Sequence, residues 1–167
     1  RYNLCLSESG SGAAPPADTR AIIPPKKSDC DALPSRVARL APDMMHFAED
    51  PKPVIILDKE GKPLKADDPH RFFEASWCHK YKGKYYFSYS TGDTHMICYA
   101  IGDNPYGPFT YQGVILTPVK SGWTTHHSIV EFKGKWYLFH HDSAPSGGVN
   151  SLRSLKVAEL HYNEDGT

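Results

Sequence analysis

A short motif recurs in this sequence, and its spacing limits the folds that the chain can adopt. Lys82-Gly83-Lys84-Tyr85-Tyr86 returns 51 residues further on as Lys133-Gly134-Lys135-Trp136-Tyr137. Each copy makes a tight turn between two strand-like segments, and no convincing helical pattern accompanies either copy. A repeat of about 40 to 50 residues that is built from short strands is typical of β-propeller blades. The sequence therefore predicts an all-β propeller.

Alternating apolar residues and runs of β-branched or aromatic residues mark the predicted strands. In chain order they cover 36–40, 53–57, 74–77, 84–90, 96–101, 111–116, 126–132, 136–141 and 154–160. The first two strands make the end of one blade, the next group makes a full blade, and the last group makes a blade without its outer strand.

The number of blades sets the domain organisation that we expect. A propeller closes with about four to eight blades, so residues 36–167 are expected to be the C-terminal portion of a larger propeller domain. Residues 1–35 are rich in Ser, Gly, Ala and Pro, which predicts a loop or linker. Within that linker, Tyr2 to Leu6 is the one stretch compatible with the end of a strand.

The composition excludes several classes of protein. The 19 basic and 19 acidic residues give a formal net charge of zero, whereas a nucleic-acid-binding surface needs a basic excess. The longest apolar run, Val54–Leu57, is far shorter than the roughly 20 residues that span a bilayer. The four cysteines form no CxxC pair, which argues against a zinc ribbon or a thioredoxin-type site. The chain does not start with Met and has no visible signal peptide, so the compartment stays open and we expect a piece of a longer protein.

One carboxylate is flanked by large aromatic residues just before the strongest strand signal. In Arg71-Phe72-Phe73-Glu74-Ala75-Ser76-Trp77, the only acidic residue is Glu74. A carboxyl group beside apolar rings is poorly solvated as an anion and holds its proton more tightly. A general acid that works near neutral pH needs that property. The alternative is a strand-edge Glu that faces water, as most surface carboxylates do.

Four separate stretches, in order, resemble glycoside hydrolase family 43. They are Phe73–Trp77, Lys84–Tyr89, Asn104–Phe109 and His126–Leu138, and the resemblance covers residues 36–167. It implies a partial five-bladed β-propeller. It also implies hydrolysis of terminal arabinofuranosyl or xylosyl units of plant polysaccharides or oligosaccharides, with inversion at the anomeric carbon. The expected partner is therefore an arabinose- or xylose-containing glycan, without nucleic acid or membrane.

The resemblance also assigns residues to the site. It implies that Glu74 is the general acid and that His126 lies on the propeller axis near the sugar, with His127 as the neighbour that could be confused with it. Arg153 corresponds to a sugar-binding arginine, Thr94 is a weaker match for a pocket residue, and Phe73 belongs to the same substrate-binding set. No cofactor is required. A structural calcium on the axis is compatible with the pattern, and because calcium prefers oxygen ligands, His126 would meet it only through water.

Two family residues have no counterpart in this sequence. Inverting hydrolysis needs a general base roughly 6.5–9.5 Å from the acid. In the family this is an Asp at the start of the first blade, and a further Asp in the second blade orients the acid. Both would lie in missing N-terminal blades of the same propeller, so this chain alone is expected to be inactive.

Other functions remain open at this stage. The main alternative is a non-catalytic carbohydrate-binding propeller, in which the same pocket holds sugar without cleaving it. A protein-interaction propeller is disfavoured because the Gly-His and Trp-Asp signatures of that class are absent from the sequence. Secreted or periplasmic localisation fits the substrate class. The choice between arabinofuranoside and xyloside is not encoded in the residues present.

Overall fold

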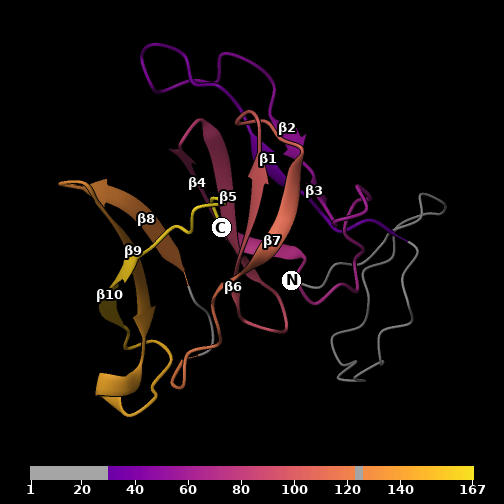
Figure 1. Ribbon diagram of the computed structural model, residues 1–167. Coiled ribbons are helices and arrows are strands. Elements are labelled where there is room, and N and C mark those ends of the chain that lie inside the picture. Colours follow the sequence, from indigo (N-terminus) through magenta and orange to yellow (C-terminus); the bar gives the residue numbers. More distant parts are fainter. Residues whose placement is uncertain (1–29, 123–125) are drawn as a thin grey trace.

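The computed structural model describes residues 30–122 and 126–167, and the fold in this part of the chain is all-β (Figure 1). Most of the expected linker, including Tyr2–Leu6, therefore lies outside the described residues. The one helical segment among them is a short 3₁₀ turn, η1 (Ala144–Ser146). No helix in the described ranges has the length and apolar character needed to cross a membrane.

Within residues 30–122 and 126–167, ten strands form three separate sheets. The strands are β1 (Ser35–Val37), β2 (Lys52–Val54), β3 (Ile56–Leu57), β4 (Phe72–Tyr81), β5 (Lys84–Thr91), β6 (Ile97–Gly102), β7 (Phe109–Leu116), β8 (His127–Phe132), β9 (Lys135–Asp142) and β10 (Ser154–Leu160). Their bounds agree with the predicted strands to within a few residues, because alternation and turn residues mark both ends of most of them.

The full blade is the antiparallel meander β4-β5-β6-β7, to which β3 adds a fifth, parallel strand beside β7. The prediction of one strand over 53–57 in the preceding blade is wrong, because these residues are divided between two sheets. The chain changes sheets at Ile55, whose carbonyl accepts a hydrogen bond from the Phe109 N–H at 2.9 Å. Val54 and Ile56 are both buried in the core that surrounds Phe109, so burial draws this segment against the outer strand of the next blade.

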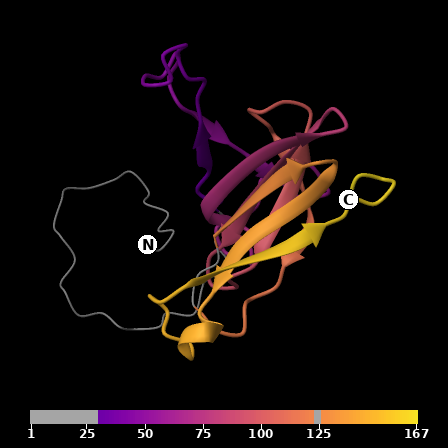
Figure 2. The same ribbon diagram turned by 90° about the vertical axis from the view of Figure 1, so that its left-hand side faces the viewer.

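The last blade is the three-stranded sheet β10-β9-β8, without an outer strand. Figure 1 shows it beside the β4–β7 sheet, and in the view turned by 90° the two sheets overlap, so they are stacked face to face (Figure 2). The other side of β4 meets β1, where the Ser35 and Ser76 hydroxyls lie 2.8 Å apart. The three sheets therefore follow one another as successive propeller blades do.

The repeated motif has the same backbone geometry in both blades. Lys82 and Gly83 have φ angles of 44° and 85°, and Lys133 and Gly134 have 52° and 78°. Two consecutive positive φ angles define the type I′ turn, whose twist suits a tight antiparallel hairpin. Each hairpin joins the first strand of its blade to the second.

The two larger sheets are joined by a seam of buried side chains. Ile129 and Leu138 are buried on the face of the last blade that meets β4. The Trp77 indole donates a hydrogen bond to the Ile129 carbonyl at 2.9 Å, from β4 to β8. This seam fixes the first strands of two blades side by side, and so brings the beginnings of β4 and β8 together.

Candidate active site

Glu74 lies where the β4 ladder is irregular. The pairing of β4 with β5 shifts register on both sides of Glu74, between Phe72 and Glu74 and again between Glu74 and Trp77. The next residue, Ala75, has a φ of 59°, a conformation that is uncommon for a residue with a side chain. A bulge of this kind re-aims the side chains around it, and bulges are frequent beside active sites.

The Glu74 carboxyl group faces a histidine from the neighbouring blade. His126 Nε2 lies 3.1 Å from Glu74 Oε1, and the two side chains are 49% and 36% exposed. His126 immediately precedes β8, so the pair spans the beginnings of the first strands of two blades. A carboxyl group and an imidazole at this distance can share a proton, and their half-exposed position leaves room for a ligand.

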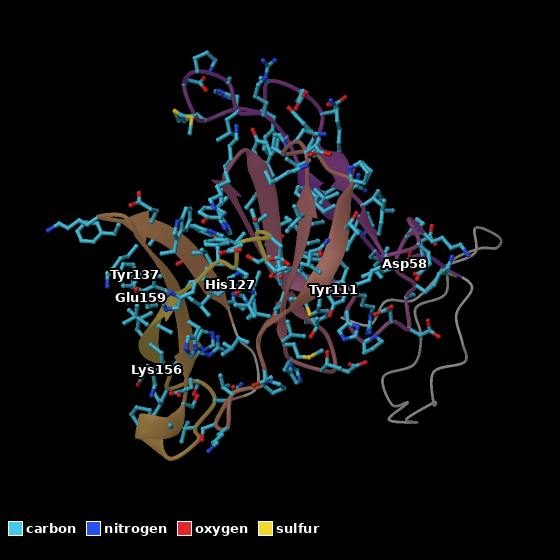
Figure 3. The ribbon with its side chains drawn as sticks, in the orientation of Figure 1. Asp58, Tyr111, His127, Tyr137, Lys156 and Glu159 are labelled. Atoms are coloured by element: carbon cyan, nitrogen blue, oxygen red, sulfur yellow. The ribbon has the colours of Figure 1, made fainter. Side chains whose placement is uncertain are left out.

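His127, the neighbour of His126, has a different environment. Its Nε2 lies 2.6 Å from the Ser88 hydroxyl on β5, and burial lowers the pKa of His127 to about 4. It lies between the two sheets (Figure 3). The structure thus separates the two adjacent histidines: His126 meets Glu74, and His127 belongs to the seam between blades.

His141, which was not predicted as a site residue, also contacts His126. The His126 backbone N–H donates a hydrogen bond to His141 Nε2 at 3.1 Å. Burial, followed by the nearby charge of Arg153, lowers the pKa of His141. Arg153 is exposed just before β10, where its Nε donates to the Asn150 carbonyl at 3.0 Å. The two 3.1 Å contacts join Glu74, His126 and His141 into one connected group.

A comparison of the sequence with known families decides the family. Residues 35–167 match the glycosyl hydrolases family 43. The chain belongs to this family. It is 75% identical over 136 residues to a β-xylosidase from Xylanibacter ruminicola, covering 81% of this chain and 42% of that protein. It is 72% identical over 147 residues to a xylosidase/arabinosidase from Bacteroides ovatus, covering 87% and 44%.

A solved structure supports the same family and fold. A family 43 β-xylosidase/α-arabinofuranosidase from a compost metagenome, solved with xylotriose in a calcium-free form, is 60% identical with a TM-score of 0.82. The match covers 85% of this chain and 43% of that one. The predicted partial propeller is confirmed. This chain spans less than half the length of the relatives that it matches.

Two other predicted pocket residues lie near the β5–β6 loop of this family 43 chain. The Thr94 hydroxyl donates to the Pro69 carbonyl at 2.7 Å and lies 2.6 Å from the Thr91 hydroxyl. Neither partner is Glu74 or His126, so these bonds stabilise the loop. Phe73 and the Arg71 guanidinium both lie beside Gly92, at 3.7 and 3.2 Å from the position that a Cβ would take there.

The expected enclosure of Glu74 between apolar rings is not found in this chain, because the flanking rings point elsewhere. Phe72 packs against Phe87 and Tyr89, with ring centroids 6.2 and 6.0 Å away. Trp77 reaches across to β8. Successive strand residues point to opposite faces, and the Glu74 side chain is 36% exposed.

The side chains at this site include few ligands for a metal ion. The described residues contain no group of three or more His, Cys, Asp or Glu side chains that could hold a metal ion. Calcium takes six to eight oxygen ligands, and Glu74 with His126 supplies only one carboxylate and one imidazole. These residues do not make a calcium site by themselves.

Proposed function

We propose that the complete protein containing this chain is an inverting glycoside hydrolase. It would remove terminal xylosyl or arabinofuranosyl units from plant polysaccharides or oligosaccharides. The observation that carries the proposal is the half-exposed Glu74–His126 pair, 3.1 Å apart at the beginnings of two adjacent blade strands. The names of the relatives, a β-xylosidase and a xylosidase/arabinosidase, support the substrate class.

Glu74 is the general acid in this proposal. Its carboxyl group protonates the glycosidic oxygen as the bond from that oxygen to the anomeric carbon breaks. A water molecule attacks the anomeric carbon from the opposite face and transfers its proton to a general base. The carboxylate left on Glu74 accepts a hydrogen bond from the His126 imidazole, which stabilises the charge that develops during the step.

The other site residues bind the sugar in this proposal. Arg153 presents a planar guanidinium that can donate two parallel hydrogen bonds to hydroxyl groups or to a carboxylate. His126, Phe73 and Thr94 complete the proposed substrate-binding set. The general base is assigned to the blades outside this chain, which spans 42–44% of the length of the two relatives. This chain alone is therefore expected to bind sugar weakly and to cleave none.

Hydrolysis of two chromogenic substrates tests the proposal. The complete protein is assayed with 4-nitrophenyl β-D-xyloside and 4-nitrophenyl α-L-arabinofuranoside, beside the Glu74→Gln variant. We expect wild-type cleavage of at least one substrate and a loss of kcat of about 10²- to 10⁴-fold in the variant. Proton NMR of the first-formed sugar should show the inverted anomer.

A matched control separates the acid from carboxylates in general. Glu159→Gln removes an exposed carboxylate on β10 that pairs with Lys135 at 3.2 Å, and surface pairs of this kind contribute little. We expect its kcat to equal that of the wild type. If the wild type binds xylan or arabinan and cleaves neither glycoside, the carbohydrate-binding alternative replaces the hydrolase proposal.

A further inference from the structure

The middle strand of the last blade extends beyond the beginning of its first strand. The pairing of β8 with β9 starts at His127 opposite His140, but β9 continues through His141 to Asp142. On its other edge, β9 remains paired at these positions, because Leu155 lies opposite His141 and Ser154 opposite Asp142. His141 is therefore held by β10 while it lies beside the residue that precedes β8.

The His141 side chain provides the hydrogen bond that the strand ladder no longer supplies. His126 would be the next residue opposite His141, but it lies outside β8. Its N–H donates instead to His141 Nε2 at 3.1 Å. To accept this bond, Nε2 carries no proton, so the neutral ring is protonated at Nδ1. The His141 imidazole thus accepts the hydrogen bond of the residue just before β8.

This bond matters because, among the described residues, the side chain of His126 is only partly packed. Its imidazole is 49% exposed, so packing fixes it only in part. The next residues along β8 are tied to the neighbouring blade, His127 to Ser88 at 2.6 Å and Ile129 to Trp77 at 2.9 Å. Those contacts fix β8, while the bond to His141 fixes His126, which extends from the strand towards Glu74.

We propose that His141 is a positioning residue that holds His126 against the Glu74 carboxyl group. It acts through the backbone of His126 and does not touch the reacting atoms. This inference rests on the proposed role of Glu74 as the acid, because a displaced His126 would leave the Glu74 carboxylate less stabilised during proton transfer.

Two substitutions at one position test the inference in the complete protein. His141→Phe keeps a ring of similar size and removes the acceptor, whereas His141→Gln keeps a side-chain carbonyl that can accept the bond. We expect His141→Phe to lower kcat on the xyloside about 10-fold and to raise KM, because His126 belongs to the proposed substrate-binding set and small misplacements of catalytic groups are costly. His141→Gln should recover most of that loss. Unchanged kcat in His141→Phe, or equal losses in both variants, would overturn the inference.

A control on the same strand shows whether any change in β9 has this effect. His140 neighbours His141 but points to the opposite face of the strand, as successive strand residues do. His140→Gln should retain kcat within about threefold of the wild type, well short of the loss expected for a displaced catalytic group. If it loses as much kcat as His141→Phe, the effect is a general disturbance of β9 and the positioning role is refuted.

A structural readout keeps this test separate from the hydrolase proposal. Crystal structures of the wild type and His141→Phe report the His126 Nε2–Glu74 Oε1 distance directly, whether or not the protein cleaves a glycoside. We expect the 3.1 Å contact in the wild type and its loss in the variant. A retained contact in His141→Phe contradicts the inference alone, whereas a wild type that cleaves neither glycoside contradicts only the proposed function.

Discussion

The segment after β10 joins the two large sheets through Tyr162, and replacing this residue tests how the blades are held together. The Tyr162 ring stacks on Tyr81 of β4 with centroids 3.8 Å apart, and meets Trp136 of β9 edge-on at 5.5 Å. It also meets Tyr86 edge-on at 5.4 Å. Its hydroxyl lies 2.5 Å from His79 Nε2. One side chain therefore contacts both sheets.

The size of the effect follows from these contacts. Tyr162→Phe removes the hydroxyl, and His79 Nδ1 is already buried without a partner among the described residues, so neither ring nitrogen would keep a hydrogen bond to that part of the chain. Leaving a buried polar atom unsatisfied costs about 1–3 kcal/mol. Tyr162→Ala also removes three ring contacts of about 0.5–1.5 kcal/mol each, so we expect a total loss near 3–5 kcal/mol, the usual range for a buried aromatic replaced by Ala.

Urea denaturation of the complete protein measures these losses. We expect the free energy of unfolding to fall in the order wild type, Tyr162→Phe, Tyr162→Ala, with an unchanged dependence on urea concentration. If Tyr162→Ala unfolds at the same urea concentration as the wild type, the segment after β10 does not stabilise the seam and the argument fails.

Three further predictions concern stability. Burial lowers the pKa of both His79 and His127 to about 4 from 6.5, so between pH 6.5 and 4 the unfolded chain binds more protons. The free energy of unfolding should therefore fall as the pH drops through this window, and urea midpoints that stay constant from pH 7 to 4.5 would contradict the assignment. Ser88→Ala removes the partner of His127, whose Nδ1 is also buried and unpaired, and should cost about 1–3 kcal/mol by the same urea assay. Gly102→Ala places a Cβ 2.8 Å from the Pro108 carbonyl and 2.9 Å from the Phe109 ring, and should lower thermal stability by about 1–3 kcal/mol, whereas an unchanged melting temperature would show that this loop adapts freely.

The strands could be predicted from the sequence because each one carries its own local signal. The Lys-Gly-Lys turns mark both hairpins, and the aromatic run marks β5, whose residues from Tyr86 to Thr91 are all buried. The sequence did not show that β2 and β3 are two strands, since Val54 and Ile56 are equally apolar. Their division depends on the packing against Phe109, which lies far from both in the sequence.

The motif stretches named Glu74 and His126 without showing how the two are arranged. The structure places their side chains 3.1 Å apart, while their roles and that of Arg153 stay predictions. The bulge at Glu74 was not visible, because Ala75 adopts a positive φ where a Gly would have signalled it. His141 was not predicted as a site residue, because which of His140 and His141 lies beside His126 depends on the register of β9 with β8.

The dependence of rate on the leaving group tests the role of Glu74 most directly. The complete protein and its Glu74→Gln variant are compared on xylobiose, whose leaving sugar needs a proton, and on 2,4-dinitrophenyl β-D-xyloside, whose leaving group departs without one. If Glu74 is the general acid, the variant loses most of its kcat/KM on xylobiose and keeps most of it on the dinitrophenyl substrate. Equal losses on both substrates would contradict this role and would leave Glu74 as a binding or structural residue.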